Sequence, residues 1–91
     1  MADKLDDRLE KFYKTIGANV KKKRVEKKLT QLQLSELMNF RSVGLVSQAE
    51  LYLKKQHFNL KHLYLIASIL ECNIEDFFEG VDIVPFEWDI N

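Results

Sequence analysis

The amino-acid sequence predicts an all-α fold of five helices with a short extended tail at its C-terminal end. Apolar residues recur at spacings of three and four through most of the 91 residues, and residues that favour helix N-caps precede several of these runs. Strand-like alternation begins only at residue 81. Because the chain is short and has no repeat or linker, we expect one domain, with residues 16–80 as its body and residues 81–91 as the tail.

The first predicted helix runs from about residue 4 to residue 28. Its apolar face recurs at spacings of four, three and four, at Leu5, Leu9, Phe12 and Ile16. Gly17 costs a helix about 1 kcal/mol relative to alanine, so a start or a break at that point stays open. Residues 1–15 would then form an N-terminal extension of this helix.

A second helix is predicted to begin after Thr30. Thr30 is a good N-cap, and Gln33 stands three residues later, where its side chain can complete a capping box. The apolar residues Leu34, Leu37 and Met38 follow at helical spacing. The sequence therefore marks this helix start twice.

A third helix is predicted after a short break. Residues 39–41 interrupt the helical period, and Ser42 is suited to cap the next helix. The inward face of that helix would hold Val46, Ala49 and Leu53. Two short helices joined by a tight turn form a corner that commonly places its second helix in the major groove of DNA.

Two further helices are predicted in the C-terminal half. Asn59 can cap the fourth helix, whose apolar face holds Leu60, Leu63, Ile66, Ala67 and Leu70. Asn73 can cap a short fifth helix, which carries acidic residues in its first turn and ends at Gly80.

The tail alternates apolar and acidic residues, a pattern typical of a strand. Phe86, Trp88 and Ile90 form its apolar set, and Pro85 limits any strand to a sheet edge. Such side chains are costly to leave in water on a small domain. Two interpretations stay open: the tail pairs two copies of the chain, or it folds back on its own helices.

Charge is divided unevenly along the chain, although the net charge is zero. Residues 11–62 contain twelve Lys or Arg and three Glu, a net charge of +9. From residue 63 onward there are seven acidic residues and no Lys or Arg, a net charge of −7. The predicted helix pair lies in the basic part, where release of counterions from phosphates would favour binding. For the lysines of the first helix alone, a solvated helix face is the simpler explanation.

Other classes of function find little support in the sequence. Cys72 is the single cysteine, and no apolar run is long enough for a leader or a membrane span, so we expect a cytoplasmic protein without membrane contact. His57 and His62 lack further metal ligands at suitable spacing, and the glycines form no phosphate loop. We expect no enzyme activity, no metal and no cofactor.

A set of residues between Ile16 and Phe78 has the order and spacing of one known family. The set comprises Ile16, Gly17, Val20, Arg24, Leu29, Thr30, Gln31, Glu50, Leu60, Leu63, Ile66, Ala67 and residues 74–78. By this set the chain resembles the phage-repressor and Cro type helix-turn-helix domains of XRE-like transcriptional regulators. The resemblance implies a five-helix lambda-repressor-like bundle that binds DNA.

The resemblance assigns roles within the helix pair. Val43, Gly44 and Gln48 would face base edges. Arg41 is not assigned by the resemblance, but its basic side chain beside the pair is expected to reach a base or a phosphate. A glutamine amide can form two hydrogen bonds with adenine, and valine can pack on a thymine methyl group. Gln48 is therefore the expected main reader and Val43 the second, whereas Gly44 would allow close approach to the DNA backbone.

Further residues would hold the DNA backbone or the fold. The expected phosphate contacts come from Gln31, Ser42, Thr30, Ser47, Lys54 and Lys55. Gln31 would also brace the third helix, and Arg24 and Glu50 would form a partly buried ion pair between the first and third helices. Because the glycine usual after that glutamate is absent, we expect the third helix to continue by a turn toward Lys55.

Together these features predict a small transcriptional regulator, a repressor, that binds operator DNA as a homodimer. A domain of this size contacts too little DNA for tight binding alone, and two copies would present their helices about 34 Å apart to a palindromic site. One alternative is an antitoxin that also neutralises a partner protein through its tail. Another is a protein-interaction module that has lost DNA readout.

Overall fold

The computed structural model describes residues 2–87, with side chains from Lys4 onward, and is all-helical in this range. Its α-helices are α1 (Ala2–Glu26), α2 (Gln31–Leu37), α3 (Gly44–Ala49) and α4 (Leu60–Leu70). Two short 3-10 helices, η1 (Leu53–Lys55) and η2 (Ile74–Phe78), complete the described part. The all-α prediction is confirmed, whereas the predicted fifth α-helix is wrong because a segment this short forms the tighter 3-10 helix η2.

α1 is one uninterrupted helix of 25 residues, so it neither starts nor breaks near Gly17. It ends at a left-handed residue: Lys28 has a φ of 61°, its N–H donates to Val25 O, and Leu29 N–H donates to Arg24 O. This Schellman motif satisfies the last carbonyls of the helix. Here a lysine takes the conformation that glycine usually adopts.

The capping box predicted for α2 is confirmed. Thr30 Oγ1 accepts a hydrogen bond from Gln33 N–H at 3.0 Å, and Gln33 Oε1 accepts one from Thr30 N–H at 2.8 Å. At the other end Asn39 has a φ of 64°, and Phe40 N–H donates to Ser35 O. Asparagine tolerates this left-handed conformation, so the chain turns sharply toward α3.

α3 begins one residue later than a cap at Ser42 would place it. Its N-cap is Val43, which has helical dihedral angles and no capping hydrogen bond from a side chain. The prediction that Ser42 caps the helix is wrong, because its hydroxyl lies one position too early and accepts only a long bond of 3.4 Å from Gly44 N–H. α3 is consequently a helix of six residues.

The predicted extension of α3 toward Lys55 is also wrong. The helix ends at Ala49, and Tyr52, Lys54 and Lys55 have left-handed φ angles between 53° and 59°. This conformation costs a residue with a side chain about 1 kcal/mol or more, and it ends the helical path. Leu53 is 50 % exposed as a result, so the prediction that it faces inward is wrong.

α4 and η2 close the bundle. Asn59 Oδ1 accepts from His62 N–H at 2.8 Å, and His62 Nδ1 accepts from Asn59 N–H at 3.1 Å, which confirms Asn59 as the N-cap of α4. Asn19 of α1 donates through Nδ2 to Phe77 O at 2.9 Å and to Glu79 O at 2.8 Å. One side chain thereby fixes η2 against α1.

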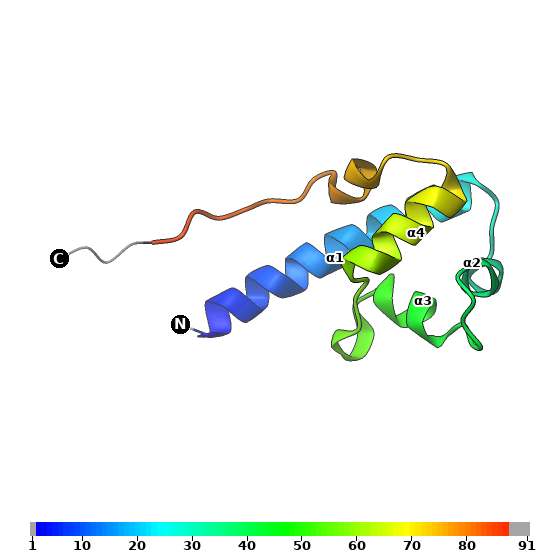
Figure 1. Cartoon of the computed structure of the whole chain (residues 1–91). Coiled ribbons are helices and arrows are strands. Elements are labelled where there is room, and N and C mark those ends of the chain that lie inside the picture. The colour runs from blue at the N-terminus through cyan, green and yellow to red at the C-terminus, as the bar shows by residue number, and fades with distance from the viewer. Residues whose placement is uncertain (1, 88–91) are drawn as a thin grey trace.

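The hydrophobic core lies where α1 meets α3, α4 and η2, with α2 packed on α3 and α4 (Figure 1). Its buried residues are Ile16, Val20, Leu34, Met38, Val46, Ala49, Phe58, Leu63, Ile66, Ala67, Leu70 and Phe77. Leu60 was expected on the inner face of α4, but it is the first residue of that helix and is 72 % exposed.

The first turns of α1 extend beyond the bundle, and residues 81–87 run back beside them (Figure 1). This tail segment is extended and forms no strand within the described residues. Ile83, Val84 and Phe86 line a hollow together with residues of α1, so the described part of the tail lies along its own first helix. Trp88 and Ile90 lie outside the described residues.

Candidate functional site

α1 and the end of α3 approach each other closely at Gly17. A Cβ atom on this residue would lie 2.4 Å from Ala49 O and 2.6 Å from Glu50 O, closer than these atoms can approach. α1 continues without a break through Gly17, so only a residue without a Cβ atom allows the two helices to make this contact. This contact sets the point at which α3 crosses α1.

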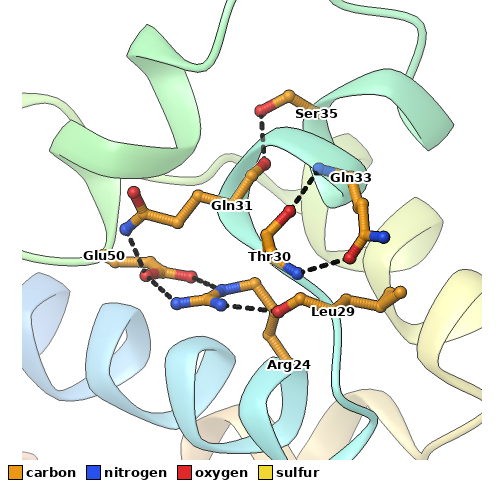
Figure 2. A network of polar contacts seen from close by, with 7 residues as sticks. All are labelled: Arg24, Leu29, Thr30, Gln31, Gln33, Ser35 and Glu50. Carbon is orange, nitrogen blue, oxygen red and sulfur yellow. Dashed lines mark hydrogen bonds and ion pairs between the residues drawn. The ribbon is translucent and has the colours of Figure 1, made fainter.

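Arg24 and Glu50 form the ion pair expected between α1 and the end of α3 (Figure 2). Arg24 Nε donates to Glu50 Oε2 at 2.7 Å, and Nη2 donates to Oε1 at 3.0 Å, a bidentate geometry. Glu50 is 1 % exposed and Arg24 is 7 % exposed. Arg24 Nη1 also donates to Leu29 O at 2.7 Å, so the same guanidinium holds the loop before α2.

Gln31 joins α2 to this ion pair. Its Nε2 donates to Glu50 Oε1 at 2.9 Å, and its backbone carbonyl accepts from the Ser35 hydroxyl at 2.9 Å (Figure 2). The amide keeps one further N–H that can donate to a phosphate. Thr30 is engaged through its capping box, and its hydroxyl proton remains as a donor. Gln31 therefore joins α2 to the end of α3, whereas the side-chain bond of Thr30 lies within α2.

α3 is anchored on one side and open on the other. Val46 and Ala49 are buried in the core, while Val43, Gly44 and Gln48 are partly exposed. The Gln48 amide forms no hydrogen bond within residues 4–87, so both its N–H groups and its oxygen are available. The three residues expected to face base edges thus lie away from the core.

The hydroxyl groups of Ser42 and Ser47, near the start of α3, differ in whether their protons are free to donate a hydrogen bond. Ser47 Oγ donates to Gly44 O at 3.1 Å, so its proton is used within the helix. Ser42 Oγ only accepts, from Gly44 N–H, and this residue is exposed. Phosphate oxygens accept hydrogen bonds, so Ser42 is better placed than Ser47 for the predicted contact.

Basic side chains flank α3 at both ends. Arg41 precedes the helix, and Lys54 and Lys55 follow it in η1. All three are exposed and form no ion pair with another residue of the described range. No carboxylate of the described residues therefore pairs directly with the basic groups expected to reach phosphates.

Acidic residues of α1 nevertheless face η1 across a hollow of about 430 Å³. Its charged lining is formed by Asp6, Asp7, Glu10, Lys54 and Lys55. Negative charge on one wall weakens the attraction of the lysines for phosphate. No role for these acids is evident from the sequence, although Asp6, Glu10 and Tyr13 share one face of α1 by their spacing.

An aromatic stack ties the left-handed segment around η1 to α1. The Tyr13 ring lies 3.9 Å from the His57 ring and 5.5 Å from the Tyr52 ring, centroid to centroid, in stacked orientations. Stacked rings contribute about 0.5 to 1.5 kcal/mol beyond their buried area. The stack therefore helps to offset the backbone strain of Tyr52, Lys54 and Lys55.

Part of the basic region lies beside the end of α3. Lys21 and Lys22 of α1 line a hollow of about 470 Å³ together with Val25 and Leu51. Both lysines are exposed. The lysines of the first helix therefore include two that are adjacent to the residues following α3.

Among the titratable groups of the described residues, His62 and Cys72 have shifted pKa values, and neither lies on α3. Burial beside the rings of Phe40 and Phe58 lowers the pKa of His62, and the charge of Lys61 acts in the same direction. Burial raises the pKa of the Cys72 thiol, again with help from a neighbour, Asp76. The neutral form of each group is favoured.

The part of the chain that the structure describes contains no group of three or more His, Cys, Asp or Glu arranged to hold a metal ion. In the same range no helix has both the length and the apolar content needed to cross a bilayer. No family model, curated protein or solved structure matches this chain.

Proposed function

We propose that this chain binds double-stranded DNA with sequence preference and acts as a small transcriptional repressor, with α3 as its reading helix. The observation that carries this proposal is the asymmetry of α3. Glu50 and the contact at Gly17 fix its inner side, whereas Gln48 has an unengaged amide on the outer side. A rigidly held helix with a free glutamine amide is suited to bidentate bonding with adenine.

The charges around α3 support the same proposal. Arg41 precedes the helix, Lys54 and Lys55 follow it, and Lys21 and Lys22 lie beside its end. Basic groups placed around a reading helix release counterions from DNA phosphates when they bind. We therefore expect the affinity for DNA to fall steeply as the salt concentration rises.

We further propose that two copies bind one palindromic operator. α3 has only six residues and can contact only a few base pairs. Specific binding by such small modules commonly uses two half-sites, whose reading helices are about 34 Å apart.

A salt-dependent titration of the full chain with a pool of DNA sequences tests these proposals. We expect the wild type to select a palindromic sequence. Gln48→Ala should cost about 1 to 3 kcal/mol at particular base pairs without changing the dependence on salt, because Gln48 carries no charge. Gln31→Ala should weaken binding to all sequences, because it removes a hydrogen bond that holds α2 to Glu50.

Gln56→Ala is the matched control, since Gln56 is an exposed glutamine outside the helix pair. It should bind DNA like the wild type. If the wild type shows no sequence preference and Gln48→Ala leaves the affinity unchanged, the chain does not read DNA through α3. The interpretation as a protein-interaction module would then be favoured.

A further inference from the structure

An apolar surface lies at the end of the molecule where α1 extends beyond the bundle. Leu5 and Leu9 of α1 are 56 % and 37 % exposed, and Ile83 and Val84 of the tail are 75 % and 48 % exposed. All four line one hollow of about 290 Å³. We call these four residues the overhang surface. Apolar side chains exposed together in this way favour contact with another surface.

The apolar residues of α1 have the spacing of a helix-pairing seam. Leu5, Leu9, Phe12 and Ile16 follow at four, three and four residues, like the a and d positions of a coiled coil. Ile16 is buried in the bundle, whereas Leu5 and Leu9 are exposed and line a hollow with the tail. The first turns of α1 extend beyond the bundle, and the tail runs beside them (Figure 1). A few helical turns in water are only marginally stable alone, so a partner helix would stabilise this end of α1.

The charges beside the overhang surface make it complementary to itself. Arg8 of α1 and Asp82 of the tail line the same hollow. In a two-fold pair every contact occurs twice, so Arg8 of each copy can face Asp82 of the other. We propose that the overhang surface binds the same surface of a second copy of this chain, with the two α1 helices antiparallel.

The position of this seam would place the two α3 helices at about the spacing of two half-sites on DNA. This comparison rests on the proposed function. The midpoint between Leu5 and Leu9 lies about 15 Å along α1 from Gly17, where α3 crosses. A two-fold axis at that midpoint separates the two crossings by about 30 Å along the helices. One turn of DNA separates half-sites by about 34 Å.

Sedimentation equilibrium of the full chain tests the pairing directly. We expect the mass to rise from 10.7 kDa toward twice that value as the concentration increases. Leu5→Glu and Ile83→Glu should each weaken the pair about tenfold or more, because each buries a charge in an apolar contact. Leu60→Glu is the matched control: this leucine of α4 is 72 % exposed and lies outside the overhang surface, so pairing should not change.

Arg8→Asp and Asp82→Arg distinguish contacts between copies from contacts within one copy. Each variant alone brings like charges together in a homodimer and should weaken pairing about tenfold. An equimolar mixture of the two variants restores two opposite-charge pairs across the interface, so the wild-type dissociation constant should return. A contact within a single copy cannot be restored by mixing two chains.

The proposed pairing is wrong if the wild type remains at 10.7 kDa, or if both Leu5→Glu and Ile83→Glu pair like the wild type. Pairing that is lost only in Leu60→Glu would place the interface on α4 and would equally contradict it. A monomeric chain whose overhang surface binds a different protein would favour the antitoxin interpretation. Normal pairing without any DNA binding would count against the proposed function alone.

Discussion

The two halves of α1 hold their charged residues in different ways. Near the N-terminal end, Lys14 Nζ lies 3.3 Å from Glu10 Oε1, and both side chains are about half exposed. Near the C-terminal end, Arg24 Nε lies 2.7 Å from Glu50 Oε2, and both side chains are buried. The first pair lies within one helix, whereas the second joins two helices and also holds a loop.

This difference shows that one repeat of apolar residues along α1 has two roles. From Ile16 onward α1 packs against the rest of the bundle. Gly17 allows the close approach of α3, and Arg24 binds Glu50 at the end of α3. Residues 4–11 are exposed and meet mainly η1 and the tail across hollows. The inner half should therefore control stability, and the outer half should control association and electrostatics.

Removing the carboxylate of Glu50 should have the largest effect. Glu50→Gln leaves the buried Arg24 without its counter-charge, and we expect the free energy of unfolding to fall by roughly 3 to 5 kcal/mol. Urea unfolding followed by far-ultraviolet circular dichroism measures this change. Glu10→Gln is the control in the outer half and should cost less than about 0.5 kcal/mol. Equal losses of unfolding free energy in Glu50→Gln and Glu10→Gln would show that the ion pairs of the two halves of α1 contribute equally to stability.

Adding one methyl group at Gly17 should have the next largest effect. Gly17→Ala forces α1 away from Ala49 O and Glu50 O, and we expect a loss of about 3 kcal/mol even though alanine favours helices. Gly44→Ala is the matched control, because its Cβ would approach Ser42 Oγ no closer than 3.5 Å. That variant should change the free energy of unfolding by less than about 1 kcal/mol. An unchanged midpoint of urea unfolding for Gly17→Ala would mean that α1 and α3 can move apart without loss of stability.

Neutralising the acids that face η1 should have a smaller effect, on DNA binding. The combined variant Asp6→Asn, Asp7→Asn and Glu10→Gln removes negative charge opposite Lys54 and Lys55. We expect it to tighten DNA binding about threefold at low salt and hardly at all at high salt, where charges are screened.

Glu71→Gln with Glu75→Gln is the control for that measurement, because these acids lie outside the hollow. It should leave the affinity nearly unchanged. An equal gain in the control would mean that net charge, and not the position of the acids, sets the affinity.

The smallest expected effect is a dependence of stability on pH. The pKa of His62 lies below 6.5 in the folded chain, so the unfolded chain binds this proton more tightly. The neutral His62 side chain therefore contributes fully to stability above the unfolded pKa of about 6.5. This contribution is lost as the pH falls through the folded pKa. His62→Gln, which can still complete the capping box, should reduce the fall in melting temperature between about pH 7.5 and about pH 5. A fall of the same size in His62→Gln as in the wild type would contradict this role of His62.

The starts of α2 and α4 could be predicted from the sequence because capping is local, whereas the start of α3, which has no side-chain cap, could not. Thr30 with Gln33, and Asn59, act on backbone groups within three residues of themselves. Helix ends were harder to predict. Lys28 and Glu71 adopt the left-handed conformation that a glycine usually signals, so their side chains give no indication of the stop.

Polar contacts between distant segments could be predicted where a resemblance supplied them. The Arg24 and Glu50 pair is of this kind. The role of Gly17 could not be predicted from α1 alone, because its value depends on two carbonyl groups of another helix. The stack of Tyr13 on His57 likewise depends on the left-handed turn around η1, which no local residue pattern indicates.

Asn19 joins parts of the chain that are made far apart in time. Its amide donates to Phe77 O and Glu79 O, which lie 58 and 60 positions later in the sequence. At about 5 to 20 residues per second, a ribosome takes roughly 3 to 12 seconds to synthesise that interval. Throughout this period the apolar face of α1 lacks η2. The longest described helix is therefore synthesised well before the segment that completes its cover, and its apolar face stays partly open to water during that interval.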